Sequence, residues 1–157
     1  MAADYSLVSR WSVPLSREDL WDVVDALLAT PDPMVWWPAV QVREFDGSRM
    51  HLRVDSPFAY SLRFALDDLT TQRPGALSFT ATGDLHGHGM VTFEDGAGHT
   101  SMVIDWRVDT RRRWMRWTAW ALRPLFVLGH RRVMSQGERH FSSWLAAQGS
   151  PGAPDMV

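Results

Sequence analysis

The spacing of apolar residues divides the chain into a strand, a helical segment, a run of strands and a helical C-terminal region. Residues 5–13 alternate between apolar and polar side chains, which predicts a half-buried strand. From Leu20 to Leu28 the apolar residues recur at helical spacing, and Ser16 is a good N-cap. Pro31 and Pro33 end this helix, and residues 34–37 leave room for one more short turn before the next proline. We therefore expect two short helices after the first strand.

Between residues 40 and 109 the pattern indicates six consecutive strands. They are expected over residues 40–45, 49–55, 59–69, 76–82, 90–94 and 101–109. Apolar residues alternate with Arg and Asp in several of them, as in an antiparallel sheet with one dry face. The only sizeable element left to cover that face is the region 111–147, which we expect to be a helix with a kink or break near residues 121–123, caused by Pro124.

The element order predicts an α+β fold: a curved antiparallel sheet of about seven strands wrapped around a long C-terminal helix. Such a sheet leaves a cavity where the helix does not fill its concave side, and cavities of this kind are common ligand sites. We expect one domain over residues 1–148. Residues 149–157 are small and contain two prolines, which predicts a disordered tail.

Composition narrows the function. The 157 residues include no cysteine, which excludes disulfides and thiolate metal sites. The formal net charge of −2 gives no reason to expect nucleic acid, although all 16 basic residues are arginine. The N-terminal residues lack a signal-peptide pattern and no stretch has the length of a membrane span, so we expect a cytoplasmic protein. No cofactor or metal is expected.

Four stretches together resemble a known family. They are Trp36-Trp37-Pro38-Ala39-Val40, the glycine-rich segment 83–89, Asp105-Trp106-Arg107-Val108, and Arg123-Pro124-Leu125-Phe126 continuing to Glu138. In order and spacing they are similar to the polyketide cyclase/dehydrase-like branch of the START-related SRPBCC superfamily. The resemblance covers nearly the whole chain and implies a helix-grip fold that binds lipid-like or polyketide-like molecules, with catalysis in some members. Gly129 stands where an asparagine is expected before the helix histidine, which puts a role for an Asn-His pair in doubt.

One stripe of the C-terminal helix carries the candidate chemistry. Phe126, His130, Met134 and Glu138 are spaced by four and share a helix face. His130, assisted by Glu138 or by Tyr60 on the apolar sheet face, is the candidate general acid or base of a cyclase or dehydratase. The favoured alternative is that His130 only holds the helix in place.

The candidate pocket combines apolar positions of the strands with the helix stripe. Trp37 is expected to close one end. The expected lining is Trp37, Leu52, Val54, Tyr60, Leu62, Phe64, Phe79, Ile104, Trp106, Trp117, Ala121, Leu125 and Met134.

Two other patterns have competing interpretations. His86 and His88 have the spacing of metal ligands on a strand, but the glycines at 83, 87 and 89 favour a bent strand with close backbone approach. Trp114, Trp117 and Trp120 alternate with arginines between residues 111 and 132, as in a helix that contacts an anionic membrane or a partner protein. A solvated helix face is the favoured interpretation of the arginines, and for the tryptophans a wall against a ring-containing ligand and ordinary core packing are both left open.

The sequence thus predicts a protein that binds a small hydrophobic molecule, lipid-like or polycyclic, between sheet and helix. A polyketide cyclase or dehydratase in the same pocket is the first alternative, and whether catalysis occurs is left open. A peripheral adaptor that uses the arginine- and tryptophan-rich helix is the second. The oligomeric state is unknown.

Overall fold

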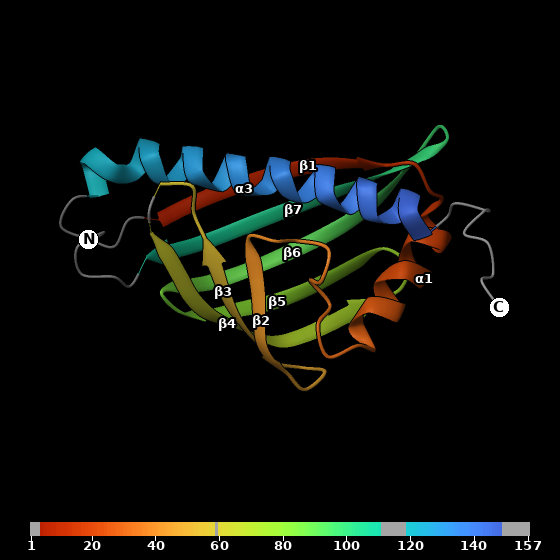
Figure 1. Ribbon diagram of the computed structural model, residues 1–157, viewed down its shortest axis with the longest axis horizontal. Coiled ribbons are helices and arrows are strands. Elements are labelled where there is room, and N and C mark those ends of the chain that lie inside the picture. The colour runs from red at the N-terminus through yellow and green to blue at the C-terminus, as the bar shows by residue number, and fades with distance from the viewer. Residues whose placement is uncertain (1–3, 59, 111–118, 149–157) are drawn as a thin grey trace.

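In the computed structural model, the described residues 4–58, 60–110 and 119–148 form seven strands and two helices (Figure 1). The elements are β1 (Asp4–Val13), α1 (Arg17–Leu28), β2 (Val40–Phe45), β3 (Met50–Asp55), β4 (Ser61–Gln72), β5 (Ala76–Gly83), β6 (Leu85–Gly96), β7 (His99–Thr110) and α3 (Ala119–Gln148).

All seven strands belong to one antiparallel sheet, in the order β1-β7-β6-β5-β4-β3-β2. Strand β1 pairs with β7 and forms one edge of the sheet. Strand β2 forms the opposite edge. The sheet curves below α3, and α3 runs along β1 over the concave side (Figure 1). This is the predicted α+β helix-grip architecture, and that prediction is confirmed.

Local signals explain α1 and its place. The Ser16 hydroxyl accepts a hydrogen bond from the backbone N–H of Asp19 at 3.1 Å and so caps the helix. Leu20 and Trp21 are fully buried, and the Trp21 ring packs edge-on against Phe93 of β6 with centroids 5.0 Å apart. α1 therefore covers one end of the sheet, where these two rings meet.

The structure differs from the prediction after α1. Residues 33–36 form turns instead of a second short helix, and the N–H of Trp37 bonds the carbonyl of Met34 at 2.9 Å. The physical reason is proline: Pro33 and Pro38 enclose the segment, and a proline restricts the residue before it to extended conformations.

The second difference concerns Pro124. In the described part of the chain α3 is helical from Ala119 to Gln148 with Pro124 inside it, so no break occurs at residues 121–123. Pro124 lies close to the N-terminal end of that range, where the loss of one backbone hydrogen bond affects the least of the helix. No helix in the described part of the chain is long and apolar enough to cross a membrane.

The core joins the concave face of the sheet to one side of α3. Phe126, Met134 and Phe141 of α3 are buried, and Leu62, Phe64 and Leu66 of β4 are buried with them in the same apolar cluster. Strand β4 departs from regular pairing between Asp67 and Thr70, where Asp68 has a φ of 53°. This bulge lets the long β4 bend, and the curvature of the sheet makes room for a cavity.

Candidate functional site

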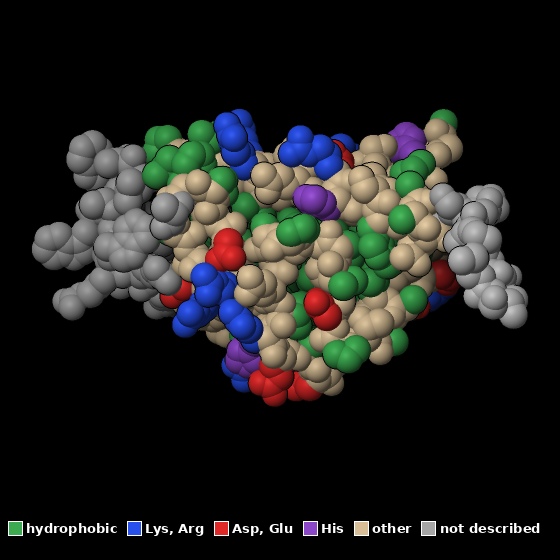
Figure 2. All heavy atoms as spheres, in the orientation of Figure 1, with side chains coloured by type: hydrophobic (Ala, Val, Ile, Leu, Met, Phe, Trp, Pro, Cys, Tyr) green, Lys and Arg blue, Asp and Glu red, His purple; other side chains and the backbone are tan. Residues whose placement is uncertain are grey.

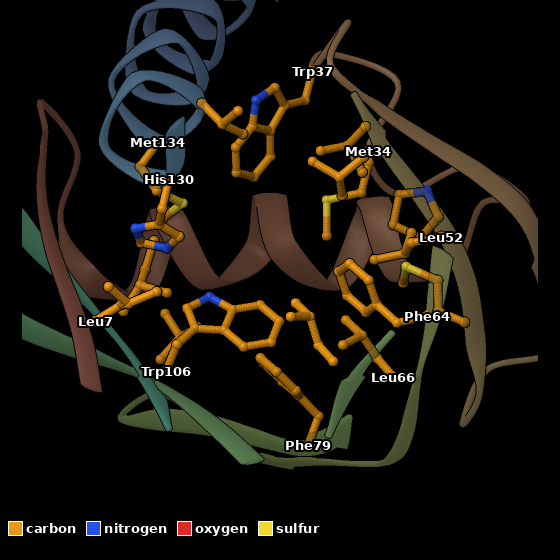
Figure 3. Close-up of a pocket in the computed structure, with 18 of the residues that line it drawn as sticks. Leu7, Met34, Trp37, Leu52, Phe64, Leu66, Phe79, Trp106, His130 and Met134 are labelled. Atoms are coloured by element: carbon orange, nitrogen blue, oxygen red, sulfur yellow. The ribbon is translucent and has the colours of Figure 1, made fainter. Parts of the chain in front are cut away.

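A cavity of about 230 Å³ lies between the concave face of the sheet and α3. Side chains from the sheet, the α1–β2 connector and α3 point into it from all sides (Figure 3). Ten residues of the predicted lining border it: Trp37, Leu52, Val54, Tyr60, Leu62, Phe64, Phe79, Ile104, Trp106 and Met134. Leu125 does not, because its side chain is 36% exposed on the outer side of α3. Trp117 and the side chain of Ala121 lie outside the described residues.

Strand register explains why these residues meet. Leu52 of β3 is opposite Phe64 of β4, and Val54 is opposite Leu62. Directly paired residues of antiparallel strands share a face, so the alternating apolar positions of both strands reach the cavity together. The alternation of apolar and polar residues therefore predicts which side chains of the strands line the cavity.

Aromatic rings form the floor of the cavity (Figure 3). Trp106 of β7 packs edge-on against Phe79 of β5 and Phe64 of β4, with centroids 5.0 and 6.0 Å apart. Gly89 of β6 is necessary for this arrangement, because a Cβ there would stand 2.4 Å from the ring of Phe79. The missing side chain leaves room for the tip of the Phe79 ring against β6.

The end of the cavity near Trp37 is an aromatic cluster. The rings of Trp36 and Trp37 stack with centroids 5.1 Å apart, and Trp11 of β1 meets Trp37 edge-on at 5.5 Å. Gly137 of α3 receives them, since a Cβ there would lie 2.6 Å from the Trp37 ring. Trp11, Trp36 and Phe141 also line the cavity and were missed as site residues. The alternation of residues 5–13 places Trp11 on the apolar face of the first strand, and this pattern could have identified it as a lining residue.

Three polar side chains, Ser56, Tyr60 and His130, interrupt the otherwise apolar lining, apart from the indole nitrogens. Two of them, Ser56 and Tyr60, lie against Gly129 on α3, the residue before His130. A Cβ at position 129 would lie 2.8 Å from the Tyr60 hydroxyl and 3.1 Å from the Ser56 hydroxyl. Both hydroxyl groups therefore approach the helix at the residue that precedes His130, in the space that glycine leaves.

His130 projects from α3 into the cavity above Trp106 (Figure 3). Its Nε2 atom is buried and has no hydrogen-bond partner among the described residues. Burial lowers the pKa of His130 to about 4, because the apolar surroundings disfavour the charged imidazolium. At neutral pH the imidazole is uncharged, with one nitrogen that donates and one that accepts a hydrogen bond.

Glu138 is placed elsewhere. Its carboxylate accepts a hydrogen bond from the backbone N–H of Ser12 at 3.0 Å, which ties α3 to the edge strand β1. It does not line the cavity. Eight residues along a helix correspond to a rise of about 12 Å, so Glu138 is more than two turns from His130. The structure thus brings His130 and Tyr60 together at the cavity and leaves Glu138 apart from them.

The glycine-rich segment belongs to the sheet. Gly83 and Gly87 have φ values of +114° and +154°, and a Cβ on Gly87 would stand 2.0 Å from the Arg107 carbonyl oxygen of β7. His86 and His88 are exposed, and His86 Nδ1 is 4.0 Å from an Asp109 oxygen. Within the described ranges no group of three His, Cys, Asp or Glu side chains is arranged to hold a metal.

The surface of α3 carries both apolar and basic side chains. Leu128 is 44% exposed, and Arg131 and Arg132 are exposed one turn further along the helix. Figure 2 shows arginine side chains beside apolar ones over α3. The tryptophans and arginines of residues 111–118 lie outside the described residues, and so do the side chains of residues 119–122.

Comparison with known proteins identifies the fold. No family model matches the chain, and no curated protein matches it. Protein Ms6760 from Mycobacterium smegmatis is similar in structure, with a TM-score of 0.62 and 18% identity over 91% of this chain and 92% of that one. TTHA0849 from Thermus thermophilus gives a TM-score of 0.64 and 13% identity over 93% and 100% of the two chains.

A third similar structure has a described activity. The Zhui aromatase/cyclase from Streptomyces sp. R1128 has a TM-score of 0.57 and 15% identity, over 94% of this chain and 99% of that chain. At such low identities the likeness establishes a shared fold, and a shared fold hosts many functions. The chain therefore has the helix-grip fold of these proteins, and its function has to be argued from its own cavity.

Proposed function

We propose that the protein binds a small hydrophobic molecule in the cavity between the sheet and α3. The observation that carries the proposal is the cavity itself, whose lining is apolar apart from a few polar groups. Ligand sites commonly combine an apolar wall with a small number of placed polar groups. Transfer of an apolar molecule from water into such a cavity is favourable, because apolar surface leaves the water.

The shape of the cavity favours a compact ligand. Its volume of about 230 Å³ is below the range of roughly 300 to 1,000 Å³ that is usual for drug-sized ligands. The flat rings of Trp106 and Phe79 at the floor suit a ring-containing molecule, since aromatic rings pack well edge-on or offset. A polycyclic ligand therefore fits better than a long extended lipid.

Native mass spectrometry of the protein purified from its own host tests the proposal. We expect a co-purifying apolar molecule at close to one per chain, identified after extraction. Val54→Trp, which fills the cavity, is expected to lower its occupancy at least tenfold. Val8→Trp is the matched control, because Val8 is 61% exposed and does not line the cavity. An empty protein that also rejects fatty acids, sterols and aromatic polyketides contradicts the proposal.

A cyclase in the same cavity has weaker support. His130 and Tyr60 border the cavity, and one protein of the same fold is an aromatase/cyclase. However, Glu138 is bound to Ser12, and a histidine with a pKa of about 4 is a weak base at neutral pH. Retained binding with abolished turnover in His130→Ala is the result that favours catalysis over simple binding.

The exposed face of α3 supports a second candidate function, contact with an anionic membrane. The exposed Leu125 and Leu128 lie close to Arg131 and Arg132, a combination that suits an anionic lipid surface. We expect co-sedimentation with phosphatidylglycerol vesicles at low salt, and a several-fold decrease at high salt or in the Leu125→Ser/Leu128→Ser double variant. Equal binding to phosphatidylcholine vesicles, or none to either, removes this candidate.

A further inference from the structure

Apart from the indole nitrogens, which include the buried Nε1 of Trp37 with no hydrogen-bond partner among the described residues, the polar side chains of the cavity lie at or next to Gly129 in the chain. The hydroxyl groups of Ser56 and Tyr60 approach Gly129 from the sheet side, and His130 is the next residue on α3. We call these three polar side chains, together with Gly129, the polar notch. Every other described side chain of the lining is apolar or an indole.

The notch has unused hydrogen-bonding capacity. The buried Nε2 atom of His130 has no partner in the described part of the chain. A buried polar group without a partner costs about 1 to 3 kcal/mol, so a ligand that supplies the partner gains affinity from it. The hydroxyl groups of Ser56 and Tyr60 can each donate one hydrogen bond and accept two, so they can bond a ligand beside any bond they already make.

The notch offers no charge to an ionised ligand. Among the described residues of the lining there is no Asp, Glu, Lys or Arg, and the one titratable base, His130, is uncharged at neutral pH. Arg123 lies over the ring of Tyr5, 5.1 Å from its centroid, and its side chain is exposed and does not line the cavity. Among the described residues, a carboxylate in the notch would therefore find no cation to replace its lost hydration.

We propose that the polar notch binds a single uncharged oxygen group, a hydroxyl or a ketone, carried by an otherwise apolar and compact ligand. This inference rests on the proposed binding function and specifies the chemistry of its ligand. The oxygen group sits beside Gly129 with Tyr60 and His130 as its hydrogen-bond partners. The apolar body extends over Trp106 toward the aromatic end at Trp37.

Three probes of the same two-ring body separate the possibilities: naphthalene, 2-naphthol and 2-naphthoate. Their dissociation constants are measured at pH 7 by equilibrium dialysis with the full chain. We expect 2-naphthol to bind about tenfold more tightly than naphthalene, which is close to the most that one additional hydrogen bond contributes. We expect 2-naphthoate to bind at least tenfold more weakly than 2-naphthol.

Variants assign the effect to the notch. Tyr60→Phe is expected to remove most of the tenfold preference for 2-naphthol and to leave the affinity for naphthalene unchanged. Ser6→Ala is the control, because it also removes one hydroxyl, and Ser6 is exposed on β1 and does not line the cavity. Should Tyr60→Phe fold poorly, Ser56→Ala tests the same notch by the same ratio.

Each result decides between distinct ideas. Equal binding of naphthalene and 2-naphthol, or a preference that survives Tyr60→Phe, overturns the notch while leaving a hydrophobic cavity that binds ligands. Tighter binding of 2-naphthoate overturns the inference that the ligand is uncharged. Rejection of all three probes also overturns it, and the molecule found by native mass spectrometry then decides the proposed function separately.

Discussion

Gly87→Ala is expected to lower the free energy of unfolding by about 4 kcal/mol and the melting temperature by roughly 10 °C. The added Cβ would stand 2.0 Å from the Arg107 carbonyl oxygen and 2.9 Å from the Val108 Cα. Both atoms belong to the backbone of β7, which is held between β6 and β1 and cannot move aside without breaking its pairing on both sides. Thermal and urea denaturation measure the effect.

Gly75→Ala is the matched control for this prediction. The nearest heavy atom to a Cβ on Gly75 is the Gln72 carbonyl oxygen at 3.8 Å, which is ordinary van der Waals contact. We expect its stability to stay within about 0.5 kcal/mol of the wild type, as for most surface substitutions. A Gly87→Ala protein as stable as Gly75→Ala would show that β6 and β7 are not closely approached at this position.

Two glycines of β6, Gly87 and Gly89, shape the sheet below the cavity. Gly87 lets β6 and β7 approach closely, and Gly89, two residues further, leaves room for the tip of the Phe79 ring at the floor of the cavity. The sequence pattern indicated a bent strand with close backbone approach in this segment, but it did not indicate which neighbour each glycine accommodates. Those neighbours come from β5 and β7, and pairing between distant segments depends on the whole sheet.

The lining residues that come from strands were predictable, because apolar side chains alternate along each strand with a period of two. Leu52, Phe64 and Trp106 were all assigned to the lining from alternation alone, and all three border the cavity. Alternation specifies the face of a strand without knowledge of its neighbours. The same reasoning works less well for a helix whose apolar residues surround most of its circumference, and Leu125, which was assigned to the pocket, is exposed on α3.

The aromatic end and the polar notch were harder to predict for a different reason. Trp36 lies in a connector, where no periodicity indicates direction, and it reaches the cavity because it stacks on Trp37. Glu138 shares the spacing of His130 on α3, yet its side chain bonds the edge strand β1. Spacing on a helix predicts a shared stripe, but whether each member meets the cavity depends on its own neighbours, since Phe141, three residues further along than Glu138, does line it.

Acidification is expected to destabilise the protein through His130. The folded-state pKa is about 4, and the ordinary value of 6.5 applies to the unfolded chain. Between these two values the unfolded chain binds the extra proton, so the free energy of unfolding falls as the pH falls from about 6.5 to about 4. The difference of about 2.5 units corresponds to a loss of about 3 kcal/mol from this one residue.

Urea denaturation of the wild type and His130→Leu at pH 7 and pH 4 measures this contribution. We expect the variant to lose about 3 kcal/mol less than the wild type between these pH values, because leucine has no proton to bind. At pH 7 it should be at least as stable, since the substitution removes a buried nitrogen that has no partner among the described residues. His140→Gln is the control, because His140 is exposed on α3 and does not line the cavity. The same pH dependence in His130→Leu and wild type would mean that His130 is hydrated in the folded protein, and the polar notch would then hold water where we place the ligand's oxygen.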